Sequence, residues 1–192
     1  GYDGVFITNH FLDGNINIDY NVPYEDKINF YFSDYEEGKK IGEEVGLKVF
    51  CGVELSYCGA DFLVYGLEKE WFLTHPEIME MSSCDYINFV KSSGGMAIEE
   101  HPFREASYRQ MVRLYPKTIE GMEVRNTAPE HYTKRGDDLS YAVCKAYNLA
   151  MTSGSDSHSV DRIGKGGMEF DEPIKNINDF ISFVKAGKGK LL

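Results

Sequence analysis

The chain has 192 residues, 42% of them hydrophobic and 27% charged, a composition that predicts a single globular domain over residues 1–192 with a sizeable core. Its net charge of −11 argues against a protein that binds long nucleic acid through a basic face. No apolar run approaches the roughly 20 residues of a membrane span, so we expect no membrane partner. No CxxC pair occurs, and we interpret the cysteines as reduced thiols of a cytoplasmic protein: Cys51, Cys58, Cys84 and Cys144.

Short apolar runs bounded by turn residues predict six strands along the chain. They fall at residues 5–7, 47–54, 61–67, 96–98, 121–124 and 149–152. Helical spacing of apolar residues predicts helices at residues 33–44, at 85–91 after a cap at Ser82 or Ser83, after a cap at Asp138, and after a cap at Asn176 or Asn178. Alternation of this kind favours an α/β fold with a mostly parallel sheet, and six or seven such strands can close as a barrel.

The longest irregular stretch lies at residues 11–29 and follows directly on His10. Long loops beside a scaffold strand often carry binding or gating functions. We therefore expect this stretch to be a lid or a substrate loop.

Polar residues able to bind metals follow most of the predicted strands. Functional groups of parallel barrels lie at the C-terminal ends of the strands. Imidazoles mixed with carboxylates suit Zn, Mn or Fe, and two such ions held close together can clamp a phosphoryl group during displacement. The pattern therefore predicts a metal site among the polar residues at these strand ends, which are His10, Glu54, His101, Glu123 with Asn126, and Asp156 with His158.

Each of these residues, taken alone, also has an ordinary structural explanation. His10 could be incidental, and Glu54 could be the polar end of its strand. His101 precedes a proline and could open a loop, whereas residues 155–158 could cap a helix. Their common position at strand ends is what favours a metal centre over these separate explanations.

Two further observations refine this expectation. Asp156 and His158 are two residues apart, so at a strand end both can face one cavity, and Gly154 allows close backbone approach. The remaining histidines fit other positions: we expect His75 at a helix start in a structural or surface role, and His131 in solvent or at a substrate rim.

Five dispersed motifs resemble those of the PHP family, the polymerase and histidinol phosphatase domains. GYDGVFITNH is similar to a family strand that ends in Thr-Asp-His, and GVELSY to its Gly-x-Glu strand. The others are similar to the family's His-Pro-Phe-Arg, Glu-x-x-Asn and Ser-Asp-x-His segments: EEHPFR, GMEVRN and SGSDSHSVDRIG. The motifs follow the family's order and span essentially the whole chain.

The resemblance implies a distorted seven-stranded (β/α) barrel that holds two or three divalent metal ions and hydrolyses phosphoesters. In that scheme His10 and His158 bind one metal, joined by Asp156, while Glu54 bridges two metals and His101 binds the second. The remaining assignments are substrate binding by Arg104 and Asn126, and catalysis by His101 and His158.

Two departures from the family pattern stand out. Asn9 replaces the family's Asp before His10, which removes a charge that could orient the ligand. The family also begins with a His-x-His strand followed by a helix, and no His-x-His occurs here. We therefore expect that Gly1 is not the biological start, and that the first strand and helix of the barrel are missing from this chain.

The leading hypothesis is a metal-dependent phosphoesterase that uses metal-activated water on a small phosphomonoester or nucleotide, without long nucleic acid as a partner. An exonuclease-type phosphodiesterase acting on short oligonucleotides is the nearest enzymatic alternative. A non-catalytic PHP-like binding or regulatory module is a second alternative. A metal-dependent sugar isomerase or amidohydrolase on a similar barrel is a third, disfavoured in its amidohydrolase form because no Lys follows a predicted strand. The sequence does not specify the oligomeric state.

Overall fold

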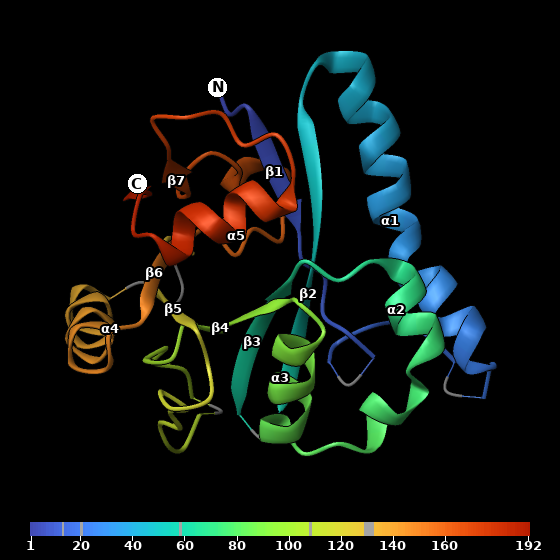
Figure 1. Ribbon diagram of the computed structural model, residues 1–192, viewed down its shortest axis with the longest axis horizontal. Helices are drawn as coiled ribbons and strands as arrows, with labels where there is room; N and C mark the ends of the chain where they lie inside the picture. The colour runs from blue at the N-terminus through green and yellow to red at the C-terminus, as the bar shows by residue number, and fades with distance from the viewer. Residues whose placement is uncertain (13, 20, 58, 108, 129–132) are drawn as a thin grey trace.

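The computed structural model describes residues 1–192 except 13, 20, 58, 108 and 129–132, and its centre is a six-stranded sheet (Figure 1). The predictions for Cys58 and His131 lie outside the described residues. The strands of the main sheet are β1 (Gly4–Ile7), β2 (Lys48–Tyr57), β3 (Ala60–Tyr65), β4 (Met96–Glu100), β5 (Gly121–Asn126) and β6 (Ala150–Gly154). A separate two-stranded sheet pairs β7 (Met168–Glu169) with β8 (Lys190–Leu191).

Helices connect the strands and cover the sheet. The α-helices of the described chain are α1 (Tyr24–Val45), α2 (Lys69–Thr74), α3 (Ser83–Ser92), α4 (Lys134–Tyr147) and α5 (Ile177–Lys185), and the short 3-10 helices are η1 (Pro76–Glu80) and η2 (Val160–Arg162). None of these helices combines the length and apolar character of a membrane span.

Strand order follows chain order from β1 to β6, but strand direction is mixed. The pairs β1–β2, β4–β5 and β5–β6 are parallel, whereas β3 runs antiparallel to both of its neighbours. The connection from Tyr57 to Ala60 is too short for a crossover, so β2 and β3 must form a hairpin. Gly59 makes this turn possible with a φ of +84°.

Three element boundaries differ from those expected. β2 extends to Tyr57, so Glu54 lies inside the strand rather than at its end. α1 begins at Tyr24, so only the first part of the stretch at 11–29 is irregular. Thr133, not Asp138, caps α4, and its hydroxyl accepts the Gly136 N–H at 3.0 Å.

Two other predicted caps are confirmed. Ser82 caps α3 by accepting the Asp85 N–H at 3.2 Å. Asn176 caps α5 by accepting the Asp179 N–H at 3.0 Å. Short polar side chains before an amphipathic segment are therefore reliable start signals here, because they satisfy N–H groups that the first turn leaves unpaired.

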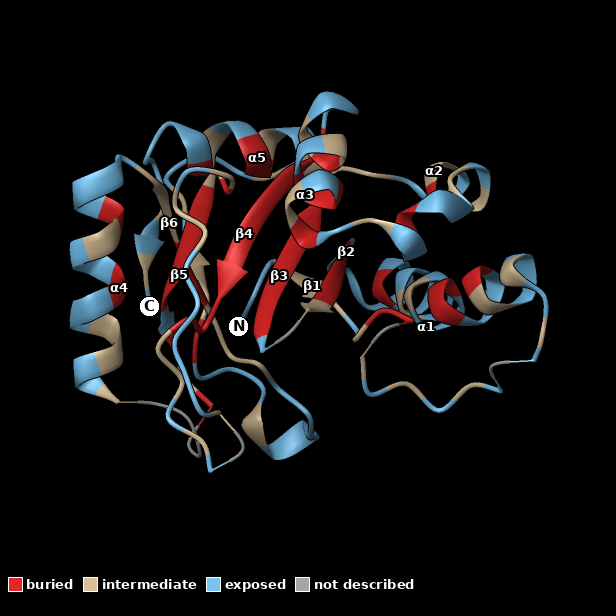
Figure 2. Cartoon of the chain, turned by 90° about the horizontal axis from the view of Figure 1, so that it is seen from below, coloured by how far each residue is buried: buried red, intermediate tan, exposed pale blue. Residues whose placement is uncertain are grey.

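The two faces of the sheet bury separate apolar clusters. One face of the sheet carries Val53, Phe62 and Ala97 and packs against α1, α3 and α4. We call it the outer face. Leu63 and Ile98 lie on the opposite, inner face, where α5 packs against them. Figure 1 shows α3 and α5 on opposite sides of β4, and Figure 2 shows how completely β3, β4 and β5 are buried between these layers.

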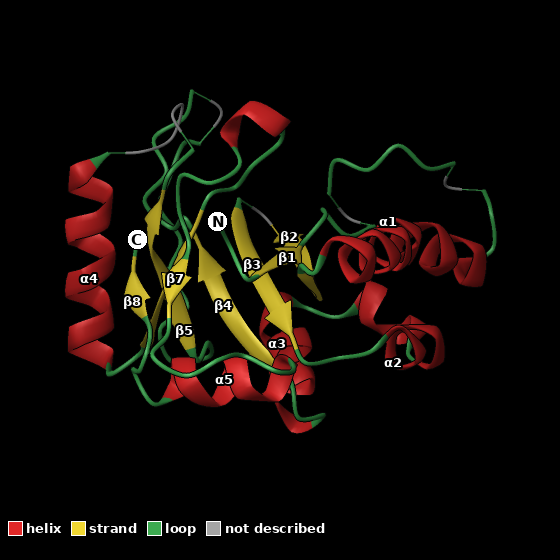
Figure 3. Cartoon of the chain, turned by 90° about the horizontal axis from the view of Figure 1, so that it is seen from above, coloured by secondary structure: helices red, strands yellow, loops and turns green. Residues whose placement is uncertain are grey.

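The sheet curls into a half-barrel. Within the described residues β1 pairs only with β2 and β6 only with β5, so these strands do not close the seven-stranded barrel that the family resemblance implies. Figure 3 shows α4 beside one edge of the sheet, α1 and α2 beside the other, and α5 across one end. The opposite end of the inner face is left for polar residues.

Candidate functional site

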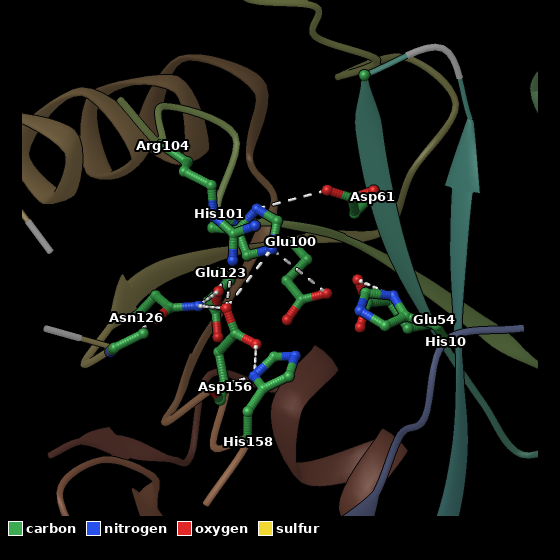
Figure 4. Close-up of polar contacts among 12 residues, drawn as sticks. His10, Glu54, Asp61, Glu100, His101, Arg104, Glu123, Asn126, Asp156 and His158 are labelled. Atoms are coloured by element: carbon green, nitrogen blue, oxygen red, sulfur yellow. Dashed lines mark hydrogen bonds and ion pairs between the residues drawn. The ribbon is translucent and has the colours of Figure 1, made fainter. Parts of the chain in front are cut away.

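Polar side chains gather on the inner face beyond the α5 contact, and Figure 4 shows ten of them converging. Strand register explains the convergence: Glu54 pairs with Leu63, which pairs with Ile98, so these three positions share the inner face. Side chains two positions apart on a strand point to the same face of the sheet. Asp61, two residues before Leu63, and Glu100, two residues after Ile98, therefore lie on this face as well. We call the resulting set the polar cluster: His10, Glu54, Asp61, Glu100, His101, Arg104, Arg109, Glu123, Asn126, Asp156 and His158.

His10 and Glu54 form one side of the polar cluster. They are joined by an isolated parallel bridge, in which the Phe11 N–H donates to the Glu54 carbonyl at 2.7 Å. His10 Nδ1 lies 3.1 Å from Glu54 Oε1. This contact raises the pKa of His10, because the carboxylate stabilises the imidazolium more than partial burial destabilises it.

His101 occupies the middle of the polar cluster. Its Nδ1 lies 3.8 Å from Asp61 Oδ2, and its Nε2 lies 3.8 Å from Glu100 Oε2 and 3.9 Å from Asp156 Oδ2. Its backbone N–H donates to Glu123 Oε2 at 3.1 Å. His101 has a φ of +28°, a conformation that side chains other than glycine seldom adopt and that is typical of functional positions.

Asp156 follows β6 and joins the other side of the polar cluster, again with a positive φ, +44°. Its side chain accepts a hydrogen bond from the guanidinium of Arg104 and a longer one, 3.5 Å, from Asn126 Nδ2. His158 Nδ1 lies 3.0 Å from the Asp156 carbonyl oxygen and 3.4 Å from Asp156 Oδ1. With its side chain 61% exposed, His158 stands at the rim, and its ring centre is 5.9 Å from that of His10.

All seven residues predicted for the site therefore lie in one cluster. Their roles as ligands, substrate contacts and catalysts remain predictions. His75 lies elsewhere, as expected: its Nδ1 is 2.6 Å from the Trp71 carbonyl oxygen, and its ring stacks on the Trp71 indole. Cys51, Cys84 and Cys144 are free thiols.

Four members of the cluster were not assigned to the site from the sequence: Asp61, Glu100, Arg109 and Glu123. Asp61 is the second residue of β3, and the N-terminal end of β3 lies at this edge of the sheet because β3 runs antiparallel to its neighbours. Arg109 lies in the loop after β4 and pairs with Asp61 and the Gly59 carbonyl. Glu123 is one of the polar residues near the predicted strand ends. It accepts hydrogen bonds from the His101 backbone N–H and from the Asn126 side chain, which places it in the cluster.

The polar cluster is electrostatically strained because it packs five carboxyl groups together. Burial raises the pKa of Glu123 to about 8. The hydrogen bond from Asn126 lowers this pKa in part, and the negative charge of Asp156 raises it further. Burial also raises the pKa of Glu100 well above its ordinary value, with the charge of Glu54 as the next cause. A bound cation would relieve both effects, since it favours the ionised carboxylates.

The donor atoms are also spaced for metal ions. Ligand atoms of Glu54, Asp61 and His101 lie within 4.8 Å of one another, and so do those of Glu100, His101 and Asp156. Mixed imidazole and carboxylate donors suit divalent transition metals. The residues present therefore fit one or more divalent ions.

Comparisons with known proteins identify relatives of this fold. Residues 137–188 match the family model described as PHP-associated. The fold resembles a two-domain protein from Bacteroides vulgatus that contains a predicted PHP-like metal-dependent phosphoesterase, with a TM-score of 0.69 at 12% identity over 99% of this chain. The chain spans 55% of that protein's length. No curated protein sequence matches the chain.

Two further solved structures share the fold. PsfC from Pseudomonas syringae aligns with a TM-score of 0.60 at 16% identity, over 94% of this chain and 73% of PsfC. An inferred metal-dependent phosphoesterase from Bifidobacterium adolescentis aligns with a TM-score of 0.52 at 12% identity, over 96% of this chain and 97% of that one. Together with the family model, these likenesses confirm the resemblance to the PHP family that the five motifs indicate.

Proposed function

We propose that this chain, with its PHP-like fold and polar cluster, is a metal-dependent phosphoesterase. The observation that carries the proposal is the convergence of three imidazoles, five carboxylates and two guanidinium groups on one end of the inner face. Carboxylates and imidazoles supply metal ligands, and guanidinium groups recognise phosphate oxygens. The phosphoesterase names of two structural relatives support the same class.

The proposed metal ligands are those predicted from the sequence, and they would hold two or three divalent ions, Zn, Mn or Fe. Bound divalent ions supply a nucleophile at neutral pH and neutralise the charge that develops on a phosphoryl group. The Glu123 carboxylate acts through its neighbours, because its hydrogen bonds fix the His101 backbone and the Asn126 amide. The ligand residues are His10, Glu54, His101, Asp156 and His158.

The remaining residues have roles that follow from their positions. Arg104 is 11% exposed at its side chain and pairs with Asp156, so its guanidinium stands beside the place a phosphate would occupy. Asn126 donates from the same side. We assign proton delivery to the leaving-group oxygen to a protonated imidazole, that of His101 or His158 in a state in which it does not bind a metal, and His158 has the more direct access to solvent.

A cavity next to the polar cluster supports a small anionic substrate. It has a volume of about 580 Å³, and three arginines line it: Arg104, Arg109 and Arg135. Phe103 and Met111 add an apolar wall. In a chain with a net charge of −11, three arginines set against one acidic lining residue, Glu105, favour a compact phosphorylated compound, such as a nucleotide, over a long polymer.

The test is turnover of nucleoside monophosphates and of labelled short oligonucleotides in the presence of Mn²⁺. We expect hydrolysis of the small phosphomonoesters, and loss of at least about 100-fold in kcat for His101→Ala and Asp156→Ala, which remove proposed ligands. His75→Ala, a histidine outside the cluster, is the matched control and should retain activity. Circular dichroism confirms that each variant is folded.

Three outcomes would contradict the proposal in different ways. Hydrolysis of oligonucleotides alone would replace the small substrate with the exonuclease alternative. Full activity in His101→Ala or Asp156→Ala would refute the assigned site. If the folded, metal-loaded protein hydrolyses neither class of substrate, the non-catalytic binding module is the better description.

A further inference from the structure

We propose that Glu100 is a further ligand of the metal centre, binding the same divalent ion as His101 and Asp156. The inference rests on the metal-dependent function proposed above and adds a ligand outside the family-derived set. Glu100 is 4% exposed, and its carboxylate points into the middle of the polar cluster (Figure 4). Its Oε2 accepts no hydrogen bond from any described residue.

The sheet register makes the position of Glu100 costly without a cation. Glu100 on β4 lies directly opposite Asp61 on β3, and both are buried on the inner face. Like charges placed directly opposite each other destabilise a sheet. Asp61 has the guanidinium of Arg109 as its counter-charge. The described ion-pair partner of Glu100 is only the imidazole of His101, at 3.8 Å.

The other carboxylates of the cluster are each paired more closely. Glu54 has His10 at 3.1 Å, and Asp156 has Arg104. Glu123 accepts hydrogen bonds from the His101 backbone and from Asn126. Glu100 is therefore the carboxylate of the polar cluster whose charge the described protein groups compensate least, and a divalent ion would compensate it directly.

The spacing of the donor atoms fits a shared ion. Two atoms bound to one ion at about 2.1 Å can be at most about 4.2 Å apart. His101 Nε2 lies 3.8 Å from Glu100 Oε2 and 3.9 Å from Asp156 Oδ2, so both of these distances satisfy that limit, and the ligand atoms of Glu100 and Asp156 lie within 4.8 Å of each other. The positive φ of His101 explains how two consecutive residues reach one ion, because it breaks the alternation of a regular strand.

The donor set indicates the kind of metal. Two carboxylates and one imidazole are richer in oxygen than the histidine-dominated sets that suit zinc, and oxygen donors suit Mn²⁺. We therefore expect Mn²⁺ to occupy the position shared by Glu100, His101 and Asp156.

The experiment is calorimetric titration of Mn²⁺ into the whole chain after chelator treatment, for the unaltered protein and for Glu100→Gln. We expect Glu100→Gln to weaken Mn²⁺ binding at least tenfold or to remove one bound ion. Glu99→Gln is the matched control, since Glu99 is also buried on β4 but faces the outer side, where its Oε2 accepts the Tyr115 N–H at 3.1 Å. It should bind Mn²⁺ like the unaltered protein. Glu100→Asp, which keeps a carboxylate, should recover part of the affinity.

Equal Mn²⁺ affinity and stoichiometry in folded Glu100→Gln and the unaltered protein would overturn the inference, as would an unaltered protein that binds no Mn²⁺. Equal weakening by Glu99→Gln would also overturn it, because the effect would then come from removing any buried charge. The phosphoesterase proposal fails separately: a chain that loses Mn²⁺ on Glu100→Gln but hydrolyses no phosphoester keeps the ligand and loses the enzymatic function.

Discussion

The buried carboxyl group of Glu123 predicts an unusual pH dependence of folding in the metal-free protein. Its pKa is raised from 4.5 to about 8, chiefly because burial disfavours the carboxylate. Between these two values the unfolded chain has released the proton and the folded chain still holds it. The folded state therefore binds more protons, and the free energy of unfolding must fall as the pH rises from about 4.5 to about 8.

The magnitude follows from the two pKa values. Each pH unit between them is worth about 1.4 kcal/mol, so the interval from 4.5 to about 8 gives a penalty of about 5 kcal/mol at pH 8. Glu123→Gln removes this penalty. Both hydrogen bonds of the group, from the His101 N–H and from Asn126, go to Oε2, so the amide oxygen of Gln can accept them. Allowing about 1 kcal/mol for each weakened bond, we expect a net gain of about 3 kcal/mol at pH 8.

The assay is urea denaturation of chelator-treated protein at several pH values between 5 and 8. Glu99→Gln is the comparison, because burial raises the pKa of Glu99 only to about 7. In this variant the free energy of unfolding should fall less steeply below pH 7 and should keep its decline between pH 7 and 8. Added Mn²⁺ should restore stability at pH 8 in the unaltered protein. A free energy of unfolding that is constant or rises from pH 5 to 8, or an unchanged slope in Glu123→Gln, would refute the reasoning.

Two further substitutions test the substrate contacts and the fold. Arg104→Gln should raise the KM for a phosphomonoester by about 10- to 100-fold, since it removes a charge-assisted contact to phosphate; an unchanged KM accompanied by weaker metal binding would show that Arg104 only supports Asp156. Thr133→Ala should lower the free energy of unfolding by about 1 kcal/mol, because Thr133 caps α4 through the Gly136 N–H. Asp138→Ala, at the cap position expected from the sequence, should cost less than Thr133→Ala because Asp138 lies inside α4.

Local sequence patterns determined most of the elements and seven of the eleven members of the polar cluster. Apolar runs marked the six strands, and Ser82 and Asn176 marked two helix starts, because strand burial and capping depend on neighbouring residues. The same logic grouped His10, His101 and Asp156, since the C-terminal ends of parallel strands meet at one edge of a sheet.

Only the tertiary structure decided strand direction and register, and with them the rest of the cluster. The hairpin reverses β3, which brings Asp61 to the same edge as the end of β4 and directly opposite Glu100. Arg109 reaches Asp61 from a loop 48 residues further along the chain. Such pairings depend on contacts between distant segments. A shift of one residue in the pairing register would move every side chain of a strand to the opposite face of the sheet. The sequence alone could therefore predict a metal centre at these strand ends, whereas the fold decides which of two adjacent carboxylates, Glu99 or Glu100, faces the polar cluster.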